Sequence, residues 1–313
     1  MGTRMAIVWN PSKTERETLE KALGDALGAE SSADVQWFET TEQDPGQGPA
    51  QAAVAAGANL LIVAGGDGTV RAVAERLAET SADVDMGIVP LGTGNLFARN
   101  LDVPIDDVPA AFERAVRGDA RPVDVGWVEL RSEGRTERHA FVVMVGFGLD
   151  AQMIAQTDED LKDKAGWLAY IESLGRAVSA SDMLRFTVAT DGGSARRAEG
   201  HTFLIANCGT LQGGLTLVPD ADPSDGELDL LVLSAEGLAQ WLGTMKSLVW
   251  DNGLKRLIRG TDDVTDTESL RHGRASTVAV TLPQPQAFEI DGEGAGETSE
   301  FTVTIQPSAI SVR

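Results

Sequence analysis

Short apolar runs alternate with amphipathic stretches over the first hundred residues of the chain. Residues 60–64 are five consecutive apolar residues before a glycine, which is typical of a strand buried on both faces of a parallel sheet. Residues 13–27 place Leu19, Leu23 and Leu27 on one helical face. Strands are expected at 4–9, 35–39, 60–64 and 86–91, and helices at 13–27, 50–58, 70–79 and 96–100. This alternation predicts a doubly wound α/β sheet.

The pattern changes near residue 121, where strand-like runs separated by turn residues become dominant. We expect strands at 123–130, 139–145, 184–190, 202–206, 228–234, 277–282, 287–290 and 301–305. Helices are expected at 164–180 and 238–259. The sequence therefore predicts a second domain of the β-sandwich type, with a boundary near residue 126.

Composition narrows the class of protein. A chain of 313 residues suits two domains better than one. The net charge of −22 argues against nucleic acid as a partner, because binding phosphates requires clustered Lys and Arg. Cys208 is the one cysteine, so no internal disulfide is expected. No run approaches the length of a membrane span and no signal peptide is evident, so we expect a cytoplasmic protein.

A glycine-rich loop gives the strongest chemical signal. It comprises Gly65, Gly66, Asp67, Gly68 and Thr69, directly after the buried strand and before a helix. Glycines allow a close approach of the backbone to a ligand, and a helix N-terminus favours an anion. A carboxylate within such a loop suits Mg²⁺ bound to phosphate oxygens. The loop therefore predicts a phosphate site, although taken alone it is equally well an ordinary turn.

Two further loops argue against an ordinary turn. Residues 90–95 read Pro-Leu-Gly-Thr-Gly-Asn, and residues 10–12 read Asn-Pro-Ser, each between a predicted strand and a predicted helix. Loops that follow parallel strands face one crevice, which is where open α/β sheets bind their ligands.

These loops resemble the soluble bacterial diacylglycerol kinase catalytic family, which includes sphingosine kinases and YegS-like lipid kinases. NAD kinases and phosphofructokinases share the first loop alone. The resemblance continues through residues 123–126, 146–150, 225–229 and 291–293 in the family order. It implies an NAD kinase- or phosphofructokinase-like α/β nucleotide-binding domain at 1–126, a lipid-substrate β-sandwich at 127–305, and a final segment, 306–313, that returns to the first domain.

The resemblance also implies roles for individual residues. ATP would contact Asn10, Pro11, Ser12, Thr41, Gly65, Gly66, Asp67, Gly68, Thr69, Val70, Arg71, Ala72, Gly92, Thr93, Gly94 and Asn95. Asp67 and Asp124 would belong to a Mg²⁺ network. Asp291 would be the general base, with Glu293 beside it. Asp225 would bind a structural Mg²⁺ together with the backbone carbonyls of Asp222 and Glu227.

The chain departs from the family pattern at three places. Lys13 stands where a glycine is frequent, Arg71-Ala72 replace an Asn-Glu pair, and Leu96 replaces an aspartate. None of these changes removes a proposed catalytic carboxylate. They bear on the nucleotide preference and on the acceptor.

The resulting hypothesis is an ATP- and Mg²⁺-dependent kinase that phosphorylates the hydroxyl of diacylglycerol or a related lipid. One alternative is an NAD- or sugar-type kinase, and another is a non-catalytic nucleotide or lipid sensor. The lipid would be met at the inner membrane face by a peripheral protein. Residues 241–260 carry Trp, Lys and Arg as an interfacial helix does, although a helix packed on the sandwich fits equally. A homodimer is the commonest assembly for such a protein.

Overall fold

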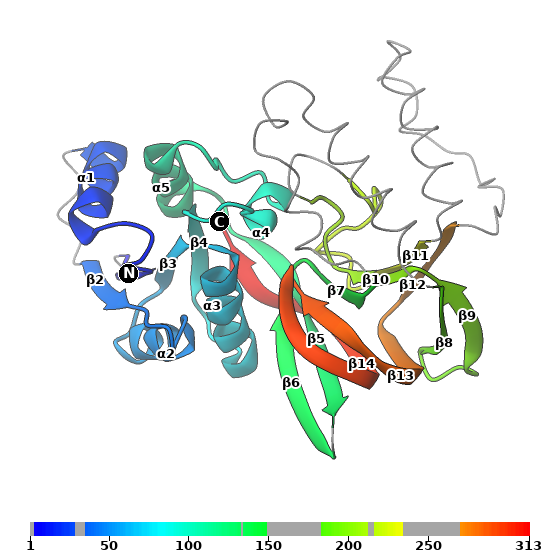
Figure 1. Ribbon diagram of the computed structural model, residues 1–313. Helices are drawn as coiled ribbons and strands as arrows, with labels where there is room; N and C mark the ends of the chain where they lie inside the picture. The colour runs from blue at the N-terminus through cyan, green and yellow to red at the C-terminus, as the bar shows by residue number, and fades with distance from the viewer. Residues whose placement is uncertain (1–2, 29–34, 133, 149–182, 212–215, 234–269) are drawn as a thin grey trace, which may run out of the picture.

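The computed structural model describes residues 3–28, 35–132, 134–148, 183–211, 216–233 and 270–313. An α/β part at the N-terminal end adjoins a strand-rich part (Figure 1). The helices expected at 164–180 and 238–259, including the interfacial stretch 241–260, lie outside the described residues.

Four parallel strands form the centre of the α/β part, in the spatial order β4-β3-β1-β2. They are β1 (Met5–Trp9), β2 (Val35–Glu39), β3 (Leu60–Gly65) and β4 (Asp85–Pro90). The helices are α1 (Arg16–Leu27), α2 (Gln47–Ala55), α3 (Asp67–Thr80), α4 (Leu96–Asn100) and α5 (Val108–Arg117). Helices α1 and α5 contact each other on one side of the sheet, and α2 contacts α3 on the other (Figure 1). The predicted doubly wound sheet is confirmed.

The remaining strands form the second part. They are β5 (Arg121–Ser132), β6 (Arg135–Phe141), β7 (Met144–Phe147), β8 (Leu184–Thr190), β9 (Arg196–Gly200), β10 (Thr202–Ala206), β11 (Leu228–Leu233), β12 (Leu270–Ala275), β13 (Thr277–Ile290) and β14 (Glu293–Val312). An aromatic core fills this part, where Phe147 packs edge-on against Phe186 and Phe203 stacks on Phe186. The predicted strand-rich second domain is confirmed.

One long strand, β14, joins the two parts. It pairs with β13 and β5 along most of its length, and its last residues, Ser311 and Val312, pair in parallel with Asp85 and Met86 of β4. The chain end therefore returns to the α/β sheet. The boundary proposed at residue 126 falls inside β5, which runs through it without a break. The exact domain limits stay a prediction.

The structure differs from the expected elements at several points. Two strands, β6 and β7, stand where a single strand was expected at 139–145. The strand is interrupted because the backbone between them donates its N–H groups to the Asp291 side chain instead of to a neighbouring strand. Helix α5 and strands β9 and β12 were not predicted. Asp107 caps the N-terminus of α5, where its carboxylate accepts the Ala110 N–H at 3.0 Å. The proline in the first turn fits a helix start, although in the sequence it reads as a helix breaker.

Candidate active site

The two glycine-rich loops touch each other at the ends of β3 and β4. The Leu91 N–H donates to the Gly65 carbonyl at 2.8 Å. A Cβ added at Gly92 would lie 2.8 Å from the Gly66 Cα, closer than real Cβ atoms approach backbone. Glycine is therefore required where the loops cross, which brings the backbone of the two loops close together, as a phosphate site requires.

The Asn-Pro-Ser segment reaches the same edge of the sheet. The Asn10 N–H donates to the Ala64 carbonyl at 3.0 Å, and the Asn10 Oδ1 accepts the Ser12 N–H at 2.9 Å. Thr41 lies one residue beyond Thr40, whose N–H donates to the Trp9 carbonyl at 3.0 Å. The predicted ATP-contacting segments thus share one end of the parallel strands.

Asp67 is the first residue of α3 and caps the start of α4. Its Oδ1 accepts the Leu96 N–H at 2.6 Å. Burial raises the pKa of Asp67, while hydrogen bonds from the backbone of Leu96, Asn95 and Phe97 oppose the rise. Asn95 keeps the second loop in shape, since its side chain accepts the Gly92 N–H and donates to the Gly92 carbonyl. The carboxylate of Asp67 is therefore anchored on one oxygen between the two loops.

Asp291 lies at the turn between β13 and β14 and is buried, with a positive φ of 50°. Its Oδ1 accepts the N–H groups of Val143 and Met144 at 2.8 and 2.9 Å, and its Oδ2 accepts the Val142 N–H at 3.0 Å. Burial raises the pKa of Asp291 to about 6, against the lowering effect of the Val142 amide and the Arg71 guanidinium. A carboxylate in this cradle has a fixed orientation and is mostly ionised at neutral pH.

Arg71, on helix α3, holds this turn against the helix. Its Nη1 donates to the Ile290 carbonyl at 3.0 Å, and its Nη2 lies 2.6 Å from Glu293 Oε2. Glu293 reaches the first loop as well, because a Cβ at Gly68 would lie 2.8 Å from its Oε1. The structure thus brings Asp67, Gly68, Arg71, Asp291 and Glu293 together from the two ends of the chain.

Asp124, expected in the same Mg²⁺ network, makes a different set of contacts. Its Oδ2 accepts the Gly226 N–H at 2.7 Å and its Oδ1 the Ser308 N–H at 2.6 Å. Its own N–H donates to the Pro223 carbonyl at 2.7 Å. These contacts tie β5 to β14 and to the loop before β11. The role of Asp124 toward Mg²⁺ stays a prediction.

Asn207 connects Asp124 with the cradle of Asp291. Its buried side-chain amide donates to the carbonyls of both Asp124 and Val142 at 3.1 Å. Sequence reasoning missed Asn207 and the amides of residues 142–144, since backbone donors leave no trace in side-chain identity. The contacts of Arg71 could not be predicted either, although the sequence identifies this arginine as a departure from the family pattern.

The donor groups present fit a magnesium nucleotide. Carboxylate oxygens are the ligands that Mg²⁺ prefers, and the ion commonly takes one or two of them together with phosphate oxygens and water. Asp67 offers a carboxylate of this kind beside the backbone N–H groups of both loops. Asp67 would hold the ion, and the loops would hold the phosphates.

The protein combines a parallel α/β sheet, which carries two touching glycine loops, with a β-rich domain that carries a buried carboxylate. Strand β14 joins the two parts. This arrangement defines a two-domain kinase architecture. Residues 4–128 match the family model described as diacylglycerol kinase catalytic domain. Residues 143–313 match the one described as YegS C-terminal NAD kinase beta sandwich-like domain.

Individual proteins agree with these matches. The chain is 32% identical over 300 residues to a Pseudomonas fluorescens protein named "Probable lipid kinase YegS-like", covering 95% of this chain and 92% of the other. It is 27% identical over 295 residues to the diacylglycerol kinase of Bacillus subtilis, covering 94% and 90%. A crystal structure of a diacylglycerol kinase from Bacillus anthracis shares the fold, with a TM-score of 0.69 at 19% identity over 99% of this chain and 96% of that one.

The chain therefore belongs to the family of diacylglycerol kinases and YegS-like lipid kinases, and is a kinase. None of the helices in the described ranges has the length and apolar character needed to cross a bilayer.

Proposed function

We propose that the protein transfers the γ-phosphoryl group of ATP, with Mg²⁺, to the hydroxyl of diacylglycerol or a related lipid. The names of the relatives support a lipid acceptor. The observation that carries the proposal is the position of Asp291, a buried, oriented carboxylate that Arg71 holds against the helix following the first glycine loop.

Asp291 is suited to accept the proton of the attacking hydroxyl. Within the described part of the chain its Oδ2 accepts one N–H, from Val142, so a lone pair of that oxygen is available for a substrate proton. Its pKa of about 6 leaves it ionised at pH 7 and still basic enough to accept a proton. General-base assistance of this kind is typically worth about 10²–10⁴ in rate.

The glycine loops would position the triphosphate, since phosphoryl transfer depends on positioning and charge neutralisation more than on covalent chemistry. Mg²⁺ would supply positive charge at the phosphate oxygens. Asp67 stays in place for this by accepting the Leu96 N–H, and its pKa is raised mainly by burial and to a smaller extent by the nearby Glu293. Both carboxylates therefore gain from a cation beside them.

The lipid is proposed to be reached from the inner membrane face, by a peripheral and transient contact, and a homodimer remains the expected assembly. Neither proposal names the lipid, because several lipids present one hydroxyl near an apolar chain.

A substrate panel tests the proposed function. Purified protein is incubated with γ-labelled ATP, Mg²⁺ and mixed micelles that contain diacylglycerol, a sphingoid base, phosphatidylglycerol or a polyprenol. Parallel samples contain NAD or a hexose in place of the lipid, and each sample is repeated in EDTA. We expect label in one lipid, dependent on Mg²⁺. If no lipid is labelled but NAD or a sugar is, the lipid acceptor is wrong and the NAD- or sugar-type alternative is right.

A further inference from the structure

An acidic loop with a single arginine lies before β11, outside the candidate active site. The loop and the start of the strand carry five acidic residues, Asp220, Asp222, Asp225, Glu227 and Asp229. Antiparallel pairing of β11 with β12 places Arg274 directly opposite Asp229. Cross-strand neighbours of opposite charge attract each other, so the register of these two strands delivers a cation to the acidic loop.

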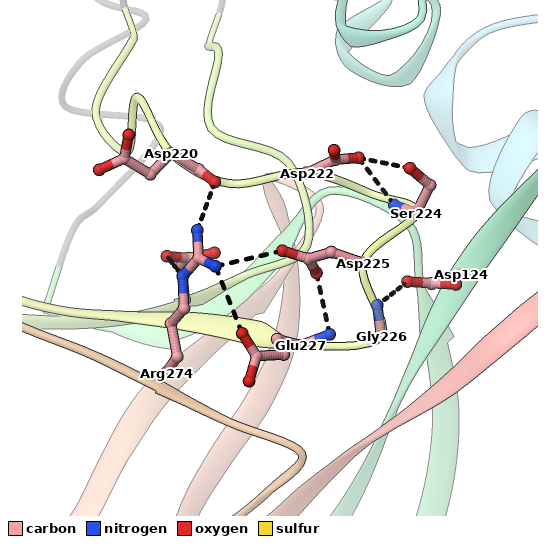
Figure 2. A network of polar contacts seen from close by, with 9 residues as sticks. Asp124, Asp220, Asp222, Ser224, Asp225, Gly226, Glu227 and Arg274 are labelled. Atoms are coloured by element: carbon pink, nitrogen blue, oxygen red, sulfur yellow. Dashed lines mark hydrogen bonds and ion pairs between the residues drawn. The ribbon is translucent and has the colours of Figure 1, made fainter. Parts of the chain in front are cut away.

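Arg274 contacts the loop through three nitrogens (Figure 2). Its Nη1 lies 3.4 Å from Asp225 Oδ2 and 3.3 Å from Glu227 Oε2. Its Nε lies 3.3 Å from Asp229 Oδ1, and its Nη2 donates to the Asp220 carbonyl at 2.8 Å. One planar guanidinium thus gathers three carboxylates and a backbone carbonyl, which its forked donor geometry allows and an ammonium group does not.

The buried member of the group has the strongest need for a cation. The side chain of Asp229 is 1% exposed, whereas that of Arg274 is 39% exposed. A buried carboxylate is costly unless it is paired and hydrogen-bonded. Arg274 lies partly in solvent and reaches inward to provide that pairing.

Two of the groups expected to bind a structural Mg²⁺, the Asp225 carboxylate and the Asp222 carbonyl, already have partners within the protein. Asp225 Oδ1 accepts the Glu227 N–H at 3.0 Å, and the Asp222 carbonyl accepts the Asp225 N–H at 3.3 Å. The other oxygen of Asp225 faces Arg274. Mg²⁺ requires oxygens at about 2.0–2.1 Å, so an ion bound to Asp225 Oδ2 would have to displace the guanidinium.

We propose that Arg274 takes the place of a structural cation in this chain and holds the 220–229 loop folded without a bound metal ion. The proposal does not depend on the reaction that the protein catalyses.

The loop held by Arg274 supports the junction of the two parts of the molecule. Gly226 donates to the carboxylate of Asp124, and the Pro223 carbonyl accepts the Asp124 N–H. Asp124 is in turn linked through Asn207 to Val142, which donates to Asp291. A loosened loop would therefore disturb the strands that carry the catalytic carboxylate.

Metal content and thermal unfolding test this proposal. The unmodified protein is desalted, weighed by native mass spectrometry in the presence of Mn²⁺ or Mg²⁺ without nucleotide, and melted in EDTA and in MgCl₂. The variants Arg274→Ala, Arg274→Lys and Asp225→Asn are treated alike. The control is Arg185→Ala, which removes an exposed arginine whose ion pair with Glu199 on β9 is long, at 3.7 Å.

We expect the unmodified protein to melt at the same temperature in EDTA and in MgCl₂. Arg274→Ala should melt about 3–8 °C lower in EDTA and recover part of the loss in MgCl₂, because the exposed carboxylates then bind the ion. Arg274→Lys should restore little of the melting temperature that Arg274→Ala loses. Arg185→Ala should melt at the same temperature as the unmodified protein.

The proposal is overturned if EDTA lowers the melting temperature of the unmodified protein and Asp225→Asn removes that sensitivity, since a metal ion then holds the loop. It is also overturned if an ion bound by the unmodified protein is lost from Asp225→Asn. Comparison with Asp225→Asn distinguishes an ion bound in this loop from an ion bound at Asp67. If Arg274→Ala fails to fold, the metal content of the unmodified protein still decides.

Discussion

Arg71 and Glu293 stand 222 positions apart in the sequence and form an ion pair of 2.6 Å between α3 and the start of β14. The arginine also donates to the Ile290 carbonyl, so its two contacts lie on either side of Asp291. The resemblance described above implies an asparagine at this position. The position of the proposed base therefore depends on a residue at which the sequence departs from that pattern.

The substitution Arg71→Asn should raise the pKa of Asp291, because the guanidinium favours the ionised carboxylate. Asp291 acts as a base only when ionised, so the acidic limb of the kcat profile should move to higher pH. A displaced turn should also lower kcat by roughly 10- to 100-fold at pH 7, with a smaller change in KM for ATP.

A matched control is Arg131→Asn, which removes an equally short ion pair of 2.6 Å with Glu300 on exposed strands. It should leave the pH profile in place. If both variants behave alike, Arg71 has no positioning role.

Burial of Asp291 predicts a pH dependence of stability. Its pKa in the folded protein, about 6, lies above the ordinary value of 3.8, so the folded state binds the proton more tightly. The contribution of this group to the free energy of unfolding is full below about pH 4 and is lost as pH rises through about 6, by roughly 3 kcal/mol in all.

Denaturant unfolding of the unmodified protein and of Asp291→Asn between pH 4 and 7 measures this contribution. The difference in stability between the two should shift in favour of the variant as pH rises. A constant difference would show that Asp291 is not desolvated as the structure indicates.

Because the two glycine loops touch, a single methyl group added at Gly92 should have a large effect on ATP binding. Gly92→Ala should push its Cβ into the Gly66 backbone and the Asn95 amide, and weaken ATP binding about 10-fold or more. Gly24→Ala on α1 is the control, because a Cβ there meets no atom within 4 Å, and a small gain of about 0.5 kcal/mol in stability is expected. Calorimetric titration with ATP compares the two. Equal affinities would mean that ATP does not use this crossing.

The contacts that Arg313 makes with the α/β part predict that this residue stabilises the protein. Arg313 lies with its Nη2 2.6 Å from Asp85 Oδ2 and donates through Nη1 to the Val116 carbonyl at 2.8 Å. Arg313→Ala should lower the free energy of unfolding by about 1–2 kcal/mol. Arg131→Ala, which breaks an exposed pair, should change it by less than about 0.5 kcal/mol. No loss in Arg313→Ala would mean that the last residue does not secure β14 to β4.

The glycine loops and the alternating elements could be predicted because both are local. Residues 60–69 contain the whole strand, loop and helix start that the structure shows. The carboxylate of Asp291 was found from its resemblance to family members, since an Asp-Gly pair alone indicates an ordinary hairpin turn.

The surroundings of these residues could not be predicted, because they depend on tertiary register. The amides that cradle Asp291 come from residues 142–144, which read as the inside of one strand. Arg274 meets Asp229 only through the pairing of β11 with β12, and β12 carried no recognisable strand pattern. Mg²⁺ binding and the role of Asp124 remain predictions.

The most direct test compares the unmodified protein with Asp291→Asn in transfer of labelled γ-phosphate from ATP to the lipid that the panel identifies, with ATP affinity measured on the same samples. We predict that the variant binds ATP as the unmodified protein does and transfers phosphate at least about 100-fold more slowly. Equal transfer rates would contradict the assignment of Asp291 as the base that activates the lipid hydroxyl.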